Sequence, residues 1–489
     1  MYRSSRREFL EQSMLAAAAS AVAAASPLRS ASAEEKSADG SNSPNEVLRV
    51  AQLGVHGQGS GHLGQWIGRQ GCEVVAIVDP DESVGQTKGV ERVEKATGKK
   101  PAFYQDLREA FEKTEIDVVS IATPNHWHAL AAIWAIQAGK DVYVEKPVSH
   151  NVSEGRRIVQ AARKHQKMVQ TGTQCRSMQG TIDAINFVKE GKIGEVKLAR
   201  GLCYKNRPSI GARGTYDVPP GIDYNIWLGP APEVTLSRPK FHYDWHWQWD
   251  YGNGDLGNQG IHQMDIARWG LGVDDLGTEA VAYGGRIGYE DAGETANTQV
   301  SIHTYGDKRL VFEVRGLKSD GEKGARVGVI FYGSDGYVVL SSYDGGAAFD
   351  LNGNMIQSFS GSGDHFGNFA QAVRSRNVDE LNADILQGHL SSALCHLGNV
   401  SYRLGSPSTL ADTAARLEGD EEALETLERV KTHLSDNMLD PNMTPITYGA
   451  TLAVDSTDEQ ITGEFADAAN PHMTREYRAP FVVPKAEDV

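Results

Sequence analysis

Cysteine is scarce in this sequence, with four residues among 489. Cys72, Cys175, Cys203 and Cys395 lie far apart, and no two of them form a C-x-x-C motif. Structural zinc sites and dithiol redox motifs both require cysteines at short spacing. The histidines also show no spacing typical of a metal site. The sequence therefore predicts no metal.

Positive charge is also in short supply, since 48 Lys and Arg face 64 Asp and Glu and the formal net charge is −16. Nucleic acids and anionic membrane surfaces repel such a chain, so we expect neither as a partner. Long apolar runs are absent as well. The uncharged run 12–28 is too short and too weakly apolar for a stable membrane span.

The first 33 residues have the pattern of a twin-arginine export signal. Arg6 and Arg7 precede the alanine-rich run 12–28, and Ser-Ala-Ser-Ala ends at Ala33. A helix with a chance Arg-Arg pair is the alternative, but the order of basic, apolar and small residues favours the signal. Residues 34–46 are predicted to be a disordered polar linker. We therefore expect a periplasmic or otherwise exported protein that crosses the membrane folded, with its cofactor loaded beforehand.

Between residues 47 and 170, short apolar stretches alternate with helical ones. Residues 47–55, 72–80, 117–124 and 141–147 are predicted to be buried parallel strands, and 125–140 a helix. This alternation indicates a doubly wound parallel sheet, the α/β Rossmann architecture.

The first strand runs into GVHGQGSGHLG, residues 54–64. In a dinucleotide-binding turn, Gly54 and Gly59 would take the first and third glycine positions and Gly57 would add slack. His56 occupies the second position and must point sideways to leave room for the pyrophosphate. Asp79 follows 20 residues after Gly59, where a carboxylate accepts ribose hydroxyls and disfavours a 2′-phosphate. A plain flexible loop and a plain turn aspartate are the alternatives. Together these features predict NAD rather than NADP.

A more specific motif is TPNHWHALAAIWAIQAGKDVYVEKPVSHN, residues 123–151. Its Thr-Pro-Asn at a strand end and Glu-Lys-Pro on the next strand resemble the Gfo/Idh/MocA oxidoreductases, the family of glucose–fructose oxidoreductase and inositol dehydrogenase. The resemblance runs from about residue 47 to the end. It implies a second α+β domain with a mainly antiparallel open sheet, and a substrate cleft between the domains. It also implies cofactor contacts at Thr123, Pro124, Asn125, His128, Glu145 and Lys146.

The family's Glu-Lys-Pro lysine, which lies near the nicotinamide and the reacting hydroxyl, corresponds to Lys146. A cation there can hold the hydroxyl and stabilise the negative charge that develops as the proton leaves. The alternative is a lysine that only pairs with Glu145.

The predicted cleft helix lies in NGDLGNQGIHQMDIARWG, residues 253–270, with Asp255 as its N-cap. Asn258, His262 and Asp265 are spaced to share one helix face. The family carries Asp-x-x-x-His on such a helix, with the histidine as general base. His262 matches, but Asn258 stands where the aspartate belongs, and an amide cannot stabilise an imidazolium as a carboxylate does. Asp265 is our candidate for the missing charge.

Candidate substrate contacts surround this helix. Trp245, Trp247 and Trp249 alternate with polar residues, which on a strand would put three indoles on one face, either for a sugar ring or for core packing. Of these we select Trp247. Lys205 and Arg207 would bind hydroxyls or a carboxylate, or would be surface charges.

We expect a substrate domain over 171–440, with amphipathic helices at 364–376 and 388–405. A polar tail over 441–489 would wrap this domain or a neighbouring subunit of a homo-oligomer.

Three functions fit these observations. The first is an NAD-dependent oxidoreductase acting on a sugar or polyol hydroxyl, with a tightly held cofactor. The second is an NAD-assisted glycoside hydrolase or lyase with no net redox change. The third is a non-catalytic sugar-binding protein. Asn258 is compatible with this function, because it stands where the family has its aspartate.

Overall fold

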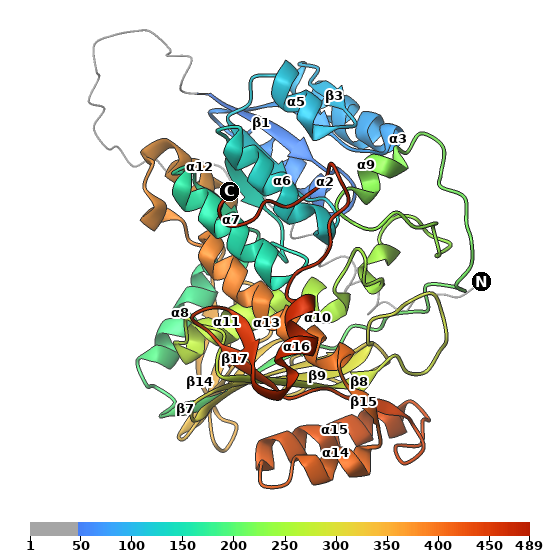
Figure 1. The fold of residues 1–489 in the computed structure, drawn as a ribbon. Helices are drawn as coiled ribbons and strands as arrows, with labels where there is room; N and C mark the ends of the chain where they lie inside the picture. Colours follow the sequence, from blue (N-terminus) through green and yellow to red (C-terminus); the bar gives the residue numbers. More distant parts are fainter. Residues whose placement is uncertain (1–46) are drawn as a thin grey trace, which may run out of the picture. The chain divides into compact units, whose positions relative to one another are not determined.

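The structure is a computed structural model that describes residues 47–489 (Figure 1). The predicted export signal (1–33) and linker (34–46) lie outside the described residues. No helix in the described part of the chain is long and apolar enough to cross a membrane.

The first 125 or so described residues build a six-stranded parallel sheet in the order β3-β2-β1-β4-β5-β6. This confirms the predicted doubly wound architecture. Two edge strands were not predicted, β3 and β6, and each is three residues long. The strands are β1 (Leu48–Leu53), β2 (Cys72–Val78), β3 (Ala102–Tyr104), β4 (Val118–Ile121), β5 (Asp141–Val144) and β6 (Val169–Thr171).

Helices cover both faces of this sheet. The central β4 and β5 are buried along their whole length, as expected of strands covered on both sides. The helices are α2 (Gln58–Trp66), α3 (Glu82–Val84), the π-helix Gly85–Val90, α4 (Glu91–Thr97), α5 (Leu107–Lys113), α6 (Asn125–Gln137) and α7 (Val152–Lys164). Helix α6 is buried almost all round, because it lies between the sheet and the C-terminal residues Phe481 and Val483.

The second sheet has twelve strands and is mainly antiparallel, as predicted. Its main path runs β14-β13-β12-β11-β7-β10-β9-β8-β16-β15, and β7 and β10 are the only parallel pair among the described strands of this sheet. The strands are β7 (Val196–Cys203), β8 (Glu279–Gly285), β9 (Thr298–Tyr305), β10 (Lys308–Arg315), β11 (Val327–Gly333), β12 (Gly336–Leu340), β13 (Gly345–Asp350), β14 (Met355–Ser360), β15 (Ser406–Ser408), β16 (Ile446–Tyr448), β17 (Leu452–Asp455) and β18 (Gln460–Thr462).

Side chains alternate between the two faces of this sheet. Leu310 and Phe312 of β10 join the core beneath α11, whereas Val311 joins a separate cluster with Leu427 of α15. The two helices predicted near 364–376 and 388–405 both form, as α12 and α13. The helices of this half are α8 (Gln179–Lys189), α9 (Tyr224–Leu228), α10 (Gly254–Asn258), α11 (Gly260–Leu271), α12 (His365–Ser375), α13 (Ile385–Arg403), α14 (Leu410–Arg416), α15 (Glu421–Asp436) and α16 (Ala466–Ala469).

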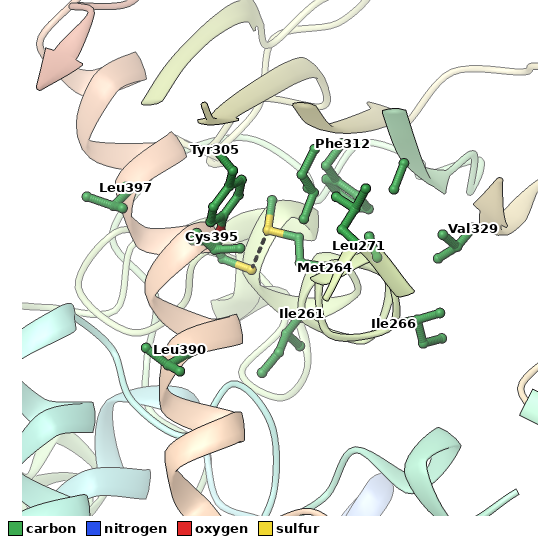
Figure 2. Close-up of a cluster of buried hydrophobic side chains, with 14 of the residues drawn as sticks. Ile261, Met264, Ile266, Leu271, Tyr305, Phe312, Val329, Leu390, Cys395 and Leu397 are labelled. Atoms are coloured by element: carbon green, nitrogen blue, oxygen red, sulfur yellow. Dashed lines mark hydrogen bonds between the residues drawn. The ribbon is translucent and has the colours of Figure 1, made fainter. Parts of the chain in front are cut away.

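Helix α11 is held tightly between the sheet and α13. Figure 2 shows Met264 of α11 facing Cys395 of α13, whose Sγ lies 3.6 Å from the methionine Sδ. A Cβ on Gly260 would come within 2.9 Å of the Phe312 ring, so this glycine lets the helix approach the sheet. The residues of α11 therefore have fixed positions, His262 among them.

The chain from 204 to 253 leaves the second sheet and packs as a separate cluster, with Trp227, Phe241 and Tyr251 around the guanidinium of Arg238. The prediction of a strand with three indoles on one face was wrong. Residues Asp244–Trp247 form a 3₁₀ helix. Trp245 stacks on His246, with ring centroids 3.6 Å apart, and Trp249 lies under Arg403.

The C-terminal tail wraps its own chain. β16 and β17 pair with β8, and the chain then runs back along α6 of the first domain (Figure 1). Phe481, Val483 and Val489 are buried there. All four cysteines are free thiols.

Candidate active site

The glycine turn between β1 and α2 has the geometry of an anion cradle. Gly54 has φ +74°, and a Cβ there would lie 2.7 Å from the Ala122 carbonyl oxygen. A Cβ on Gly59 would lie 2.0 Å from the Gly54 carbonyl oxygen, so both positions require glycine. Gly57 has φ +53° with open space beside it. In the described chain no group accepts from the backbone N–H groups of His56, Gly57 and Gln58. These free donors at a helix N-terminus suit a diphosphate.

His56 points sideways, as we expected of a side chain that must leave room for the pyrophosphate. Its ring stacks in parallel on His242 of the second domain, with centroids 4.6 Å apart and an interplanar angle of 3°. Burial and the neighbouring His242 lower the pKa of His56. The imidazole therefore leaves the second glycine position of the turn clear.

Asp79 lies at the carboxyl end of β2 and is 6% exposed. Its two oxygens accept from the backbone N–H groups of Val55 and Asp81, both at 3.0 Å. The carboxylate is thereby fixed next to the glycine turn, and each oxygen keeps a lone pair for a ribose hydroxyl. Burial raises the pKa of Asp79 to about 6, although the two N–H groups oppose the rise.

This pKa predicts a pH dependence of cofactor binding. Only the ionised carboxylate accepts from both ribose hydroxyls, so protonation competes with binding once the pH falls below about 6. NADH affinity should then weaken by up to about tenfold per pH unit. A fluorescence titration of NADH between pH 4.5 and 8 measures this. In Asp79→Asn, affinity should be lower at pH 8 and its acid fall should disappear. An identical acid slope in the variant would assign the titration to another group.

Thr123-Pro124-Asn125 begins α6 opposite the glycine turn. The buried Thr123 hydroxyl has no hydrogen-bond partner among the described residues. Asn125 donates to Asn253 of the second domain at 3.0 Å. His128 bridges backbone, with Nδ1 2.6 Å from the Pro147 carbonyl oxygen and Nε2 2.8 Å from that of Thr123. Asn125 thus ties the start of α6 to the second domain, and His128 ties it to the backbone that follows β5. Direct cofactor contacts by these residues stay a prediction.

Glu145 is a buried carboxylate held by helix α2. The Nε2 atoms of His62 and Gln58 lie 3.0 and 3.3 Å from its Oε1. Burial alone would raise its pKa, but His62 and the charge of Lys146 outweigh burial and lower the pKa to about 2. Glu145 is therefore ionised and compensates a cation in the cleft.

Lys146 reaches across to the second domain, where its Nζ donates to the Asn258 carbonyl oxygen at 2.9 Å. That oxygen is free because the helix breaks at Gln259. In a continuous helix the His262 N–H would donate to Asn258, but here it donates to the Gln259 carbonyl at 3.1 Å. Burial lowers the pKa of Lys146, although the charge of Glu145 opposes this. Lys146 is thus more than the surface partner of Glu145.

His262 is 3% exposed, and its Nδ1 has no hydrogen-bond partner among the described residues. Its ring lies 5.0 Å from that of Tyr343, centroid to centroid. Burial lowers the pKa of His262 to about 3, and the charge of Lys146 contributes. The imidazole is therefore neutral at pH 7 and available as a base.

Two predictions for the cleft helix need correction. Asp255 is not the N-cap, because α10 begins at Gly254 and Asn253 occupies the N-cap position. Asp265 does not supply charge to His262. Its carboxylate is bound by the Arg176 guanidinium at 2.8 and 2.9 Å and by the Ser391 hydroxyl at 2.8 Å. That ion pair is buried and structural.

Arg207 and Lys205 converge on the same helix and are not isolated surface charges. Arg207 forms a bidentate pair with Asp255 at 2.7 and 2.8 Å and lies over the Trp247 ring. The Lys205 Nζ donates to Gln259 at 2.5 Å. Both positive charges lower the pKa of Lys146. Trp247 itself is 4% exposed, so the structure places it mainly in packing beneath Arg207.

Sequence reasoning missed His62 and Tyr343. Gln58 and His62 are four residues apart on α2, a spacing that could have suggested a shared partner. Tyr343 comes from the turn between β12 and β13 and carries no local signal. No cluster of three or more metal-ligating side chains occurs within residues 47–489.

Comparison with known proteins agrees with this geometry. The model of the oxidoreductase family's NAD-binding Rossmann fold matches residues 48–173, and the model of its C-terminal alpha/beta domain matches residues 210–434. The chain belongs to the Gfo/Idh/MocA oxidoreductase family, and NAD is its cofactor.

The relatives found by sequence are named as enzymes that cleave glycosides. The chain is similar to an alpha-N-acetylgalactosaminidase of Shewanella oneidensis, with 34% identity over 155 residues, or 31% of this chain and 34% of that protein. A glycosyl hydrolase family 109 protein of Shewanella pealeana is 33% identical over 205 residues, or 39% of this chain and 44% of that one. These matches span less than half of either relative.

Among solved structures, the fold is similar to the WlbA dehydrogenase of Bordetella pertussis, crystallised with NADH and UDP-GlcNAcA. The TM-score is 0.53 at 19% identity, covering 72% of this chain and 95% of that chain. An Agrobacterium radiobacter oxidoreductase in complex with NAD⁺, L-tartaric acid and magnesium gives a TM-score of 0.52 at 17% identity, covering 72% and 95%.

Proposed function

We propose that this protein oxidises a hydroxyl of a carbohydrate or polyol and keeps its NAD bound through the cycle. The observation that carries the proposal is that Lys146, just after β5, donates to the Asn258 carbonyl at 2.9 Å and lies near enough to a neutral His262 for its charge to lower the pKa of that histidine. When bound, NAD supplies an acceptor for the hydride of the carbinol carbon. The free N–H groups of the glycine turn and the fixed carboxylate of Asp79 fit its diphosphate and ribose.

The chain's own residues then handle the proton and the charge. His262, unprotonated at pH 7, takes the hydroxyl proton. Lys146 holds the substrate oxygen and stabilises the negative charge that develops on it. Lys205 and Arg207 add positive potential at this end of the cleft, since both lower the pKa of Lys146. Glu145, ionised and buried, accepts from the Lys146 backbone N–H at 3.0 Å and so helps to position Lys146.

A second candidate is glycoside cleavage without net redox change. The names of the Shewanella relatives favour it. Oxidation of a sugar hydroxyl acidifies the neighbouring C–H, so that a base can remove this proton and the glycosidic substituent can leave. Addition of water at the carbon that lost the substituent, followed by return of the hydride, would close the cycle and leave a new reducing end. The initial oxidation needs the same Lys146 and His262, so the two candidates share one active site.

The predicted twin-arginine signal bears on how the cofactor is used. We propose that the protein is exported already loaded with NAD. Free NAD outside the cytoplasm would be too scarce to replace a cofactor that dissociates. A closed cycle follows, in which either a second substrate or the cleaved sugar takes the hydride back. Cell fractionation of the Arg6→Lys/Arg7→Lys variant tests export, because the variant should stay in the cytoplasm.

Three measurements on one preparation separate the functions. Protein purified without added NAD should release roughly one nucleotide per chain on denaturation. Sugars and glycosides should then yield a reduced second sugar or new reducing ends, with little net NADH absorbance. Steady accumulation of NADH would indicate an ordinary dehydrogenase. An empty protein that binds NAD only near millimolar concentration, about −4 kcal/mol, would contradict the closed cycle and favour a binding protein.

Asn258→Asp probes the departure from the family motif. A carboxylate four residues before His262 should raise the pKa of this histidine and stabilise its protonated form. Turnover should stay the same or rise up to about tenfold. The measurement is initial rate against pH, with Asn258→Ala as the matched control that adds no charge. A large loss in Asn258→Asp alone would show that the reaction requires the amide.

A further inference from the structure

A segment of the second domain is joined to the nucleotide-binding domain directly beyond Asp79. Ile222 forms an isolated bridge with Asp81. The Asp223 N–H donates to the Pro80 carbonyl at 2.9 Å, and the Glu82 N–H donates to the Gly221 carbonyl at 3.1 Å. The Gln105 amide donates to the Pro80 and Gly221 carbonyls at 2.8 and 3.1 Å. The end of β2, where the ribose is expected, is therefore bordered by backbone from the second domain.

His242 adds side-chain contacts to this junction. Its Nε2 lies 2.9 Å from Asp81 Oδ2, and its ring stacks on His56 of the glycine turn. Asp81 is 7% exposed, and its other oxygen accepts from the Val84 N–H at 3.1 Å. One histidine of the second domain thus contacts both nucleotide-binding loops, the turn after β1 and the loop after β2. We call His56, Asp81 and His242 the histidine clamp.

The segment that carries His242 is well anchored. Trp127 of α6 donates from its indole N–H to the Trp227 carbonyl at 3.0 Å, and His126 Nε2 lies 2.9 Å from the same oxygen. Arg478 donates to the Asn225 and Gly229 carbonyls at 2.8 and 3.0 Å. The hydrophobic cluster around Arg238 includes Phe241, next to His242. The segment therefore cannot swing aside without breaking its own packing.

We propose that the histidine clamp slows release of NAD by holding the second domain against the two loops that border the nucleotide site. The inference rests on the proposed function, in which the cofactor stays bound. A nucleotide whose diphosphate lies on the free N–H groups of the turn and whose ribose reaches Asp79 lies beside both clamped loops. Departure of that nucleotide requires the clamp to open first. His56 thus has a positive use at the position where the motif normally has glycine.

The test measures the rate at which bound NADH leaves when excess NAD is added, by the loss of NADH fluorescence. His242→Ala and His56→Ala should each release NADH about tenfold faster than wild type. His56→Ala loses the aromatic stack, and His242→Ala loses both the stack and the hydrogen bond to Asp81. His165→Ala is the matched control. This half-buried histidine ends α7, and its side chain makes no hydrogen bond within residues 47–489. Its release rate should equal that of wild type.

Two further variants separate the contacts of His242. His242→Phe keeps a ring for His56 but loses the bond to Asp81, whereas His242→Gln keeps a donor for Asp81 but loses the stack. Both should release NADH at rates between wild type and His242→Ala, and melting temperatures identify any variant that has failed to fold. Slow release that is unchanged in all four folded clamp variants overturns the clamp and leaves the proposed function standing. Wild-type protein that releases NADH within the mixing time overturns both.

Discussion

His262→Ala should lower turnover by about 10³-fold, and Lys146→Ala should have an effect of similar size. The two side chains act on one oxygen, His262 as the acceptor of its proton and Lys146 as the cation that stabilises the resulting charge. Loss of either side chain therefore removes most of the stabilisation of the transition state. The double variant should therefore lose little more than either single variant.

The readout is initial rate with saturating sugar, alongside the nucleotide content and melting temperature of each variant. Lys140→Ala is a suitable control, since Lys140 directly precedes β5 and lies outside the cleft. It should keep its rate within about twofold, as expected of a surface substitution. Near-native turnover in folded His262→Ala would place the base on another residue and refute the assignment.

Asp265→Ala should destabilise the fold by about 3–5 kcal/mol, because it leaves the Arg176 guanidinium buried without its partner. The side chains of Arg176 and Asp265 are 9% and 1% exposed, so water cannot replace the lost contact. Chemical denaturation with urea measures the change. The rate per folded molecule should stay close to wild type, because the carboxylate belongs to the ion pair rather than to His262.

Two comparisons strengthen this test. Arg176→Met with Asp265→Leu removes both charges and should recover much of the lost stability. Lys113→Ala removes an exposed ion pair with Glu109 and should leave the denaturation midpoint unchanged. If Asp265→Ala were as stable as wild type but inactive, Asp265 would be a catalytic residue after all.

The residues predicted for the nucleotide site lie together in the structure because their positions follow from topology. Gly54, Asp79 and Lys146 each come at or just after the carboxyl end of a parallel strand, and such ends lie along one edge of the sheet. Local patterns were therefore sufficient to bring them together. β3 and β6 escaped prediction because each is three residues long.

Features decided by distant partners could not be predicted. The break at Gln259 comes with two distant contacts, the bond from Lys146 to the Asn258 carbonyl and the close approach of Gly260 to Phe312. The alternation of Trp245, Trp247 and Trp249 indicated a strand. Each of these indoles instead packs against a partner of its own, such as His246 or Arg207. Asp265 occupies the expected helix face, but Arg176 comes from a 3₁₀ turn 89 residues earlier.

The return of the C-terminal tail to α6 sets the order in which the molecule can be completed. Domains generally fold from the N-terminus during synthesis. Here the nucleotide-binding domain is made first, but Trp127 and Trp134 of α6 lack their contact with Phe481 until that residue has been made. The first domain to be synthesised thus receives its last core residues, Phe481, Val483 and Val489, only after the second domain has been made. Until Phe481 has been made, we expect the face of α6 that it covers to be open to chaperones and to aggregation.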